Sequence, residues 1–208
     1  MNKLFVAVFC LGLLGALTHG DSQPTSVPAA NNNITRTTAS VRDAAKDSNK
    51  EASELGDALG EHEDAVPGRL QDFLRSTNRL TALRDHLKED LTAYDHAAAS
   101  ALSVFDKEAS GINDPVVMKN MTLLRRKTQE DHAERQQSAN ETITLLDNVL
   151  AKGNDLAHAA NCVMIANDLH TKGELVNEQT SDARRSAVTY ENTTNTLLGK
   201  ITTVLSQN

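Results

Sequence analysis

Small and apolar residues recur along this chain with the spacing of a helix that packs against near-parallel neighbours. Over residues 38–66 they alternate at intervals of four and three positions, which is a period of about 3.5. The repeating positions, two of which are polar, are Val41, Ala45, Ser48, Ala52, Leu55, Leu59, His62 and Val66. The pattern predicts a long helix that ends at Pro67-Gly68, because a residue before proline is pushed away from helical backbone angles.

The same stripe continues over residues 69–110, where it is widest. Its positions are Leu70, Phe73, Thr77, Leu80, Leu87, Leu91, Tyr94, Ala98, Ala101 and Phe105, flanked by Leu74, Leu83 and Leu102. A stripe of this width is typical of a helix in a bundle rather than of a two-stranded coiled coil. Asp114 is predicted to cap the next helix and Pro115 to take its first position, because both residue types are preferred there.

Two further segments, 115–152 and 156–205, carry interrupted versions of the stripe. The first begins its stripe at Val117, Met121, Leu124 and Thr128, and resumes it at Ile143, Leu146, Val149 and Leu150. The Gly-Asn-Asp sequence at 153–155 is predicted to separate the two helices, with glycine ending one and aspartate capping the next. A break is also expected near residues 171–174, because Gly173 lies in a polar stretch.

These segments predict an all-α fold, an elongated antiparallel bundle of three or four long amphipathic helices that forms a single domain over residues 38–208. The connections between segments are short, and short connections place consecutive helices antiparallel. No alternating β-branched run bounded by glycine occurs in the sequence, so strands are not expected.

Residues 1–20 have the organisation of a cleaved secretory signal peptide. Lys3 supplies a positive charge, an apolar run follows over residues 4–16, and the small residues Thr18 and Gly20 precede the expected cleavage point. The apolar run is too short to span a membrane, which takes about twenty residues. We therefore expect a secreted, extracellular protein.

Residues 21–37 are expected to form a flexible arm between the signal peptide and the bundle. Pro24, Pro28 and three consecutive asparagines interrupt this stretch, and it carries no apolar period. No second long apolar run follows in the sequence, so no transmembrane span is expected.

Four asparagines lie in N-glycosylation triplets: Asn33, Asn120, Asn140 and Asn192. Glycans are bulky and must face solvent, so the triplets predict exposed positions on a glycoprotein. Asn140 and Asn192 fall between stripe positions and fit an exposed helix face best, whereas Asn120 lies beside the stripe residue Met121.

The charge balance argues against nucleic acid as a partner. Removing Lys3 with the signal peptide leaves 20 basic and 28 acidic residues, a net charge of −8. A negative surface repels phosphates, and few aromatic rings are available to stack on bases. The short basic cluster at residues 125–127 is interpreted as a solvated helix face, with a processing site or a contact for an anionic partner as alternatives.

Cys162 is the one cysteine outside the signal peptide, so an internal disulfide is excluded. Two interpretations stand side by side: a small apolar core residue next to Val163, or an interchain disulfide that joins a homodimer. His158 lies four residues earlier on the same helix face, but one such pair falls short of the three or four ligands of a zinc site.

The sequence contains no nucleophile elbow, phosphate loop, metalloprotease helix or calcium loop, so we expect neither a catalytic site nor a metal or other cofactor. The main feature that the sequence predicts is a set of long helical faces, and these favour binding of an extracellular protein partner or receptor. Two alternatives remain open. The bundle interior could carry a lipid, sterol or other small apolar ligand, or the chain could form a disulfide-linked structural homodimer.

Overall fold

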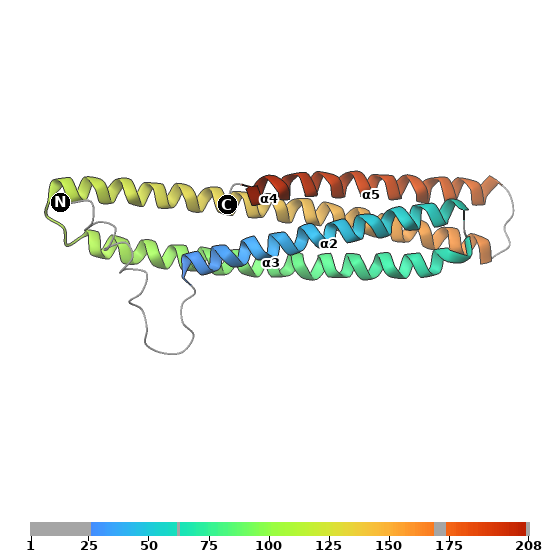
Figure 1. The fold of residues 1–208 in the computed structure, drawn as a ribbon, viewed down its shortest axis with the longest axis horizontal. Helices are drawn as coiled ribbons and strands as arrows, with labels where there is room; N and C mark the ends of the chain where they lie inside the picture. The colour runs from blue at the N-terminus through green and yellow to red at the C-terminus, as the bar shows by residue number, and fades with distance from the viewer. Residues whose placement is uncertain (1–25, 62, 169–173, 207–208) are drawn as a thin grey trace, which may run out of the picture. The chain divides into compact units, whose positions relative to one another are not determined.

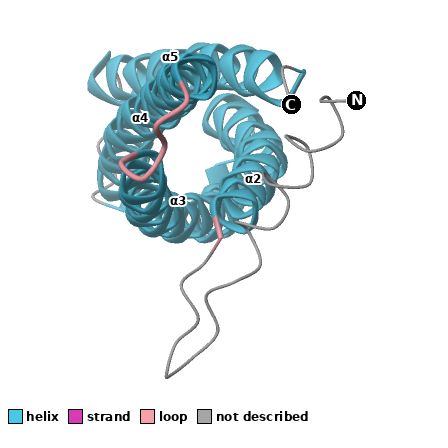
Figure 2. Cartoon of the chain, turned by 90° about the vertical axis from the view of Figure 1, so that its left-hand side faces the viewer, coloured by secondary structure: helices cyan, strands magenta, loops and turns pink. Residues whose placement is uncertain are grey.

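The computed structural model describes residues 26–61, 63–168 and 174–206. Its helices are α2 (Val27–Glu61), α3 (Val66–Ala109), α4 (Pro115–Asp168) and α5 (Glu174–Ser206), with the short 3₁₀ turn η1 (Glu63–Ala65) before α3 (Figure 1). Over these residues the fold is all-α, as the sequence predicts, and no strand is present among them (Figure 2). The expected signal peptide and the first part of the expected arm lie outside the described residues.

The chain divides into two compact units. Unit 1 comprises residues 1–33 and 90–134, and unit 2 comprises residues 34–89 and 135–208. Each helix that crosses a unit boundary contributes one part to each unit, and the two units are described separately below.

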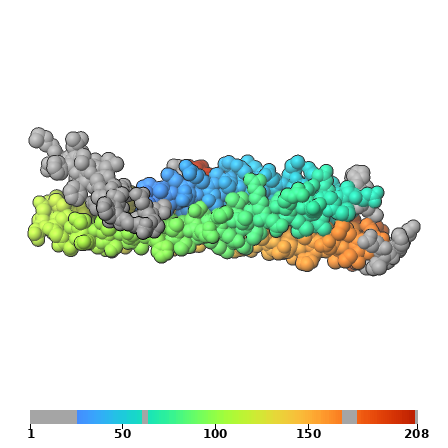
Figure 3. All heavy atoms as spheres, turned by 90° about the horizontal axis from the view of Figure 1, so that it is seen from below, coloured from blue at the N-terminus to red at the C-terminus, as the bar shows by residue number. Residues whose placement is uncertain are grey.

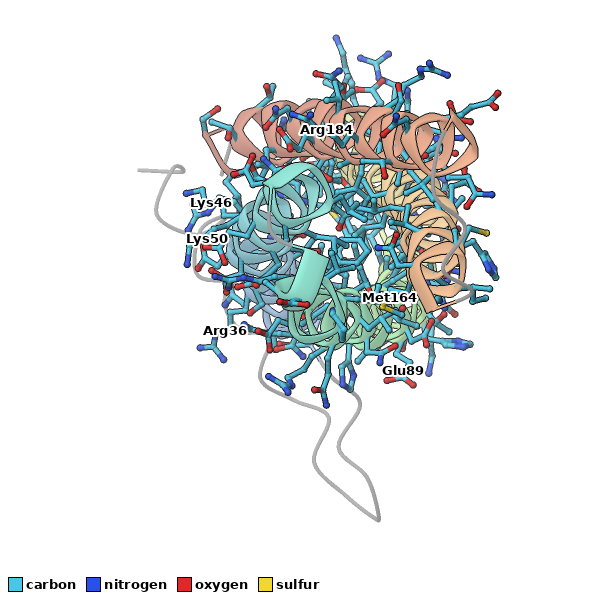
Figure 4. The ribbon with its side chains drawn as sticks, turned by 90° about the vertical axis from the view of Figure 1, so that its right-hand side faces the viewer. Arg36, Lys46, Lys50, Glu89, Met164 and Arg184 are labelled. Atoms are coloured by element: carbon cyan, nitrogen blue, oxygen red, sulfur yellow. The ribbon has the colours of Figure 1, made fainter. Side chains whose placement is uncertain are left out.

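Unit 2 is an up-down-up-down bundle built from parts of all four helices (Figure 1). Ion pairs between side chains join each helix to the next, and consecutive helices run in opposite directions (Figure 1). The ion pairs join Asp47 of α2 to Arg79 of α3, Arg84 of α3 to Asp147 of α4, and Glu141 of α4 to Lys200 of α5. Lys46, Lys50 and Glu89 point outward in Figure 4, while apolar side chains fill the space between the helices.

The core of unit 2 follows the predicted stripe. Its largest fully buried apolar side chains include Leu55, Leu80, Leu87, Leu146, Leu156, Leu197 and Ile201. Burying such a side chain contributes roughly 1.5–3 kcal/mol, so this stripe is the main source of the bundle's stability.

A layer of side chains around Tyr190 joins the four helices of unit 2. The Tyr190 hydroxyl is 2.5 Å from Ser48 Oγ of α2, and Ser76 of α3 donates to the same Ser48 oxygen at 3.0 Å. The Tyr190 ring meets Phe73 of α3 edge-on, with centroids 5.1 Å apart. Gly153 of α4 completes the layer, because a Cβ there would lie 3.3 Å from the Tyr190 ring. Burial raises the pKa of Tyr190 above its ordinary value of 10.0, and the hydrogen bond with Ser48 opposes that shift.

Gly153 shows that the predicted boundary at 153–155 is wrong. α4 continues through this sequence to Asp168, and α5 begins at Glu174. Gly153 lies inside the helix, where a Cβ would make tight contacts with the side chains of Thr77 and Tyr190, and it does not end the helix. The break expected near residues 171–174 agrees with these bounds, although residues 169–173 themselves are not described.

The first helix begins earlier than its apolar period indicates. α2 starts at Val27 rather than Thr38, so residues 27–37 of the expected arm are helical. Ser26 caps this helix, with its Oγ 3.4 Å from the backbone nitrogen of Ala29. Ala30 and Ile34 are buried and extend the stripe toward the N-terminus. Pro28 is tolerated because the first turn of a helix needs no amide donor.

No helix among the described residues is both long enough and apolar enough to cross a membrane. This finding concerns α2 to α5, and the apolar run at residues 4–16 falls outside it.

Candidate functional site

The parts of α3 and α4 that belong to unit 1 form an antiparallel hairpin over residues 90–134. α4 begins as the sequence predicts, with Pro115 at its first position. The Asp114 Oδ1 atom caps the helix by accepting the backbone amides of Val116 at 2.8 Å and Val117 at 3.2 Å. The cap fixes the direction in which the first turns of α4 present their side chains.

Two polar contacts hold the register of the hairpin. Arg125 of α4 donates to both carboxylate oxygens of Asp106 of α3, at 2.5 and 2.9 Å. These hydrogen bonds hold the pKa of Asp106 below, and that of Arg125 above, the ordinary values. Further along, His132 Nε2 lies 3.0 Å from Asp95 Oδ1, and its ring packs 5.3 Å from that of Tyr94.

The first turns of α4 expose an unusual amount of apolar surface. Among the described residues, five of the eight large hydrophobic side chains that are exposed lie between positions 116 and 124. They are Val116, Val117, Met118, Leu123 and Leu124, with exposed fractions of 68, 42, 37, 46 and 37%. We call residues 116–127 of α4 the hairpin surface. The hairpin as a whole, residues 90–134, is coloured green to yellow in Figure 3, which shows one of its faces. Clustered apolar exposure of this kind marks an interaction site more often than scattered exposure does.

Helical periodicity gathers four of these side chains on one side of α4. At about 100° per residue, Val116, Val117, Leu123 and Leu124 fall within an arc of about 120°. Asn120 lies at the middle of that arc, three or four residues from each of the four apolar positions. The acceptor asparagine of one predicted glycosylation triplet is therefore surrounded by exposed apolar side chains.

The hairpin surface is also basic in a chain that is acidic overall. Residues 115–129 contain Lys119, Arg125, Arg126 and Lys127 and no Asp or Glu, whereas the whole chain has a net charge of −7. Arg126 and Lys127 are exposed and pair only with residues one turn further along α4, Glu130 at 3.6 Å and Asp131 at 3.4 Å. Exposed pairs of this kind contribute little to stability, so a partner's carboxylates can compete for these cations.

The exposure of Val117 and Leu124 departs from the stripe predicted for residues 115–152. Met121 of the same stripe is half-buried. The period correctly placed these residues on one side of the helix. It did not reveal that this side of α4 is left exposed. Val116 and Leu123, the most exposed of the group, lie outside the predicted stripe and were not expected to be functional.

All four asparagines of the predicted glycosylation triplets are exposed: Asn33 in α2, Asn120 and Asn140 in α4, and Asn192 in α5. In two of the triplets, the third residue is buried rather than exposed. Thr142 and Thr194 are buried, and their hydroxyls donate to the backbone carbonyls of Ser138 and Tyr190 at 3.0 and 2.9 Å. Exposed asparagines have room for glycans, and their occupancy stays a prediction.

Cys162 is a free, exposed cysteine on α4, so its interpretation as a core residue is wrong. Its neighbour Val163 takes the buried position instead. His158 is exposed on the same face, and Ile165, three residues beyond Cys162, has 59% of its side chain exposed. Over the described residues, no group of three or more His, Cys, Asp or Glu side chains is arranged to hold a metal ion.

The comparisons with known proteins give no family for this chain. No family model, curated protein sequence or solved structure matches it. The class that the fold itself defines is that of an all-α protein built on helical-bundle packing.

Proposed function

We propose that this chain is a secreted, non-enzymatic glycoprotein that binds an extracellular protein partner through the hairpin surface. The observation that carries the proposal is the cluster of exposed apolar side chains between Val116 and Leu124. Leaving these side chains in water forgoes roughly 25 cal/mol for each Å² that a partner could cover. A partner that covers them gains this free energy on docking.

The basic side chains of the hairpin surface favour an acidic partner. Lys119 and Arg126 lie at one edge of the apolar arc, and Lys127 lies within it. An amphipathic helix with acidic side chains beside its apolar face would match this arrangement, because opposite charges steer association and fix its register. The partner proposed is therefore an acidic, apolar helical segment of another extracellular protein.

A protein suits this surface better than an anionic membrane does. A helix that lies in a lipid surface keeps its charged groups on the side away from the acyl chains. Asn120 and Lys127 lie inside the apolar arc and would have to enter the apolar layer with it. A protein partner can place a carboxylate or an amide opposite each of them.

A direct binding experiment tests the proposal. Residues 21–208, produced without glycans, are titrated against a fluorescent synthetic helix with leucines on one face and glutamates beside them. We expect the double variant Val116→Glu/Leu123→Glu to bind at least about tenfold more weakly, which corresponds to about 1.4 kcal/mol. Both side chains are exposed, so circular dichroism should show unchanged helix content.

Ile165→Glu provides the matched control, because it adds a carboxylate at an exposed apolar position of α4 outside the hairpin surface. It should bind the acidic peptide as the unsubstituted protein does. Equal affinity of the double variant would contradict the proposal. Tighter binding to anionic vesicles than to the peptide, lost in the same double variant, would assign the surface to membranes instead.

Exposure of Cys162 supports a second candidate, a disulfide-linked homodimer. Two exposed thiols in an oxidising compartment can pair across a two-fold axis, and the exposed Ile165 beside each would be covered in the contact. The alternative of an apolar ligand inside the bundle gains no such support at the layer around Tyr190, where a Cβ at Gly153 would already make close contacts.

A gel without reductant tests the dimer. Freshly secreted protein should migrate at twice the monomer mass, and reductant or Cys162→Ser should return it to the monomer position. An unsubstituted protein that runs as a monomer without reductant would rule out the covalent dimer. Val116→Glu/Leu123→Glu serves as a control, because it leaves Cys162 intact and should still form the disulfide.

A further inference from the structure

We propose that an N-glycan on Asn120 covers the hairpin surface and decides whether the acidic partner can dock. The inference rests on the proposed function, since it concerns regulation of the same surface. It assigns to one of the four glycosylation triplets a role that the other three do not share.

The position of Asn120 on α4 is the first argument. Residues three and four apart on a helix are surface neighbours, with Cβ atoms about 5–6 Å apart. The four such neighbours of Asn120 are Val116, Val117, Leu123 and Leu124, and all four are exposed. A glycan attached to the Asn120 side chain therefore emerges from the middle of the apolar arc and has apolar side chains on both sides along the helix axis.

The triplets at Asn140 and Asn192 lack this environment. The corresponding neighbours of Asn140 are Gln136, Gln137, Ile143 and Thr144, and the one large apolar side chain among them, Ile143, is buried. Around Asn192, Val188 is the one exposed large apolar neighbour. A glycan at Asn140 would cover surface that is already polar, so Asn140 supplies the matched control.

Steric exclusion follows from the same geometry. A partner helix that covers both edges of the apolar arc has to pass over Asn120, because Val116 and Leu123 lie on one side of it and Val117 and Leu124 on the other. A bulky, hydrated glycan at that point prevents the approach and keeps the apolar side chains from self-association. Without the glycan, the surface is open to the partner.

Asn120 occupancy can be measured by itself. Trypsin cleavage after Lys119 and Arg125 releases residues 120–125, which contain one triplet and no other. Protein secreted from eukaryotic cells should show the glycan mass on this peptide. Finding only unmodified peptide in secreted protein would overturn the inference.

The functional test compares secreted wild type with Asn120→Gln and Asn140→Gln. We expect Asn120→Gln to bind the acidic peptide at least about tenfold more tightly than wild type, with a parallel rise in the fluorescence of an apolar dye. Asn140→Gln keeps the Asn120 glycan and should match wild type in both measurements. Thr122→Ala should behave as Asn120→Gln does, because it removes the triplet while keeping the asparagine side chain.

Failure of the inference is distinguishable from failure of the proposed function. Equal dye fluorescence and equal peptide binding in glycosylated wild type and Asn120→Gln would overturn the shielding role. In that case peptide binding lost in Val116→Glu/Leu123→Glu would still support the docking surface. Higher dye fluorescence in Asn120→Gln with no peptide binding in any form would uphold shielding and overturn the proposed partner chemistry.

Discussion

Replacing Tyr190 by alanine is expected to lower the free energy of unfolding by about 3–5 kcal/mol. The ring is fully buried and packs edge-on against Phe73, so its removal leaves a cavity in the centre of unit 2. The substitution also deletes the partner of the Ser48 hydroxyl. Chemical denaturation followed by circular dichroism measures the change.

Tyr190→Phe separates the ring from the hydroxyl. It keeps the contact with Phe73 and removes the hydroxyl with its hydrogen bond to Ser48, whose oxygen still accepts one from Ser76. We expect a loss of about 1 kcal/mol. A loss as large as that of the alanine variant would show that the hydroxyl, and not the packing of the ring, dominates the layer.

The same pair of proteins gives a dependence on pH. The pKa of Tyr190 is raised in the folded protein, chiefly by burial, above the ordinary value of 10.0. The neutral hydroxyl therefore contributes its full stability below pH 10, and this contribution falls as the pH rises through the higher folded-state pKa. Tyr190→Phe should lack that fall, so the two unfolding free energies should converge at high pH.

Gly153→Leu is expected to destabilise the protein by at least about 2 kcal/mol. The Cβ atom alone would lie 3.3 Å from both Thr77 Cγ2 and the Tyr190 ring, and 3.6 Å from Phe73. The rest of a leucine side chain has no space without displacing these groups. The overpacking cost exceeds the gain of roughly 0.8 kcal/mol that leucine brings over glycine as a helix former.

Gly199→Leu is the control for that gain. A Cβ at Gly199 meets nothing within 4 Å, so leucine there should stabilise the protein by up to about 0.8 kcal/mol. Opposite signs for the two glycines, measured in the same denaturation assay, are the expected result. Equal stabilisation at both positions would contradict the close packing described around Tyr190.

The period of the apolar residues was sufficient to predict the bundle and most of its core. Leu55, Leu80, Leu146 and Leu197 are buried as the stripe requires, and Asp114 caps α4 as predicted. Periodicity succeeds here because it records directly which side of each helix is removed from water.

The glycines could not be interpreted from local sequence. Gly153 has the same sequence context as a helix-ending glycine, and its true role depends on Tyr190, which lies far along the chain. Gly56 of α2 is similar, because a Cβ there would lie 3.1 Å from that of Ala187 in α5. By local propensity, each of these glycines lowers the stability of its helix. In the structure, each permits a close approach of two helices.

The candidate site was only partly visible in the sequence. Asn120 and the basic cluster at 125–127 were recognised separately, and the stripe assigned Val117 and Leu124 to the core. The structure instead places Val117 and Leu124 beside Asn120 on one exposed side of α4. A period shows which side of a helix is apolar, but tertiary structure decides whether a neighbour covers that side.

If the glycosylation triplets are used, the buried threonines of two of them require sugar attachment to precede folding. Once unit 2 has formed, the Thr142 and Thr194 hydroxyls are enclosed and bonded to carbonyls of their own helices. An enzyme that must read the whole triplet can do so only before the bundle closes. Thr122 is exposed, so the triplet at Asn120 can still be read after folding. If the triplets are glycosylated, sugar attachment at Asn140 and Asn192 competes with folding, whereas Asn120 and Thr122 remain exposed in the folded chain.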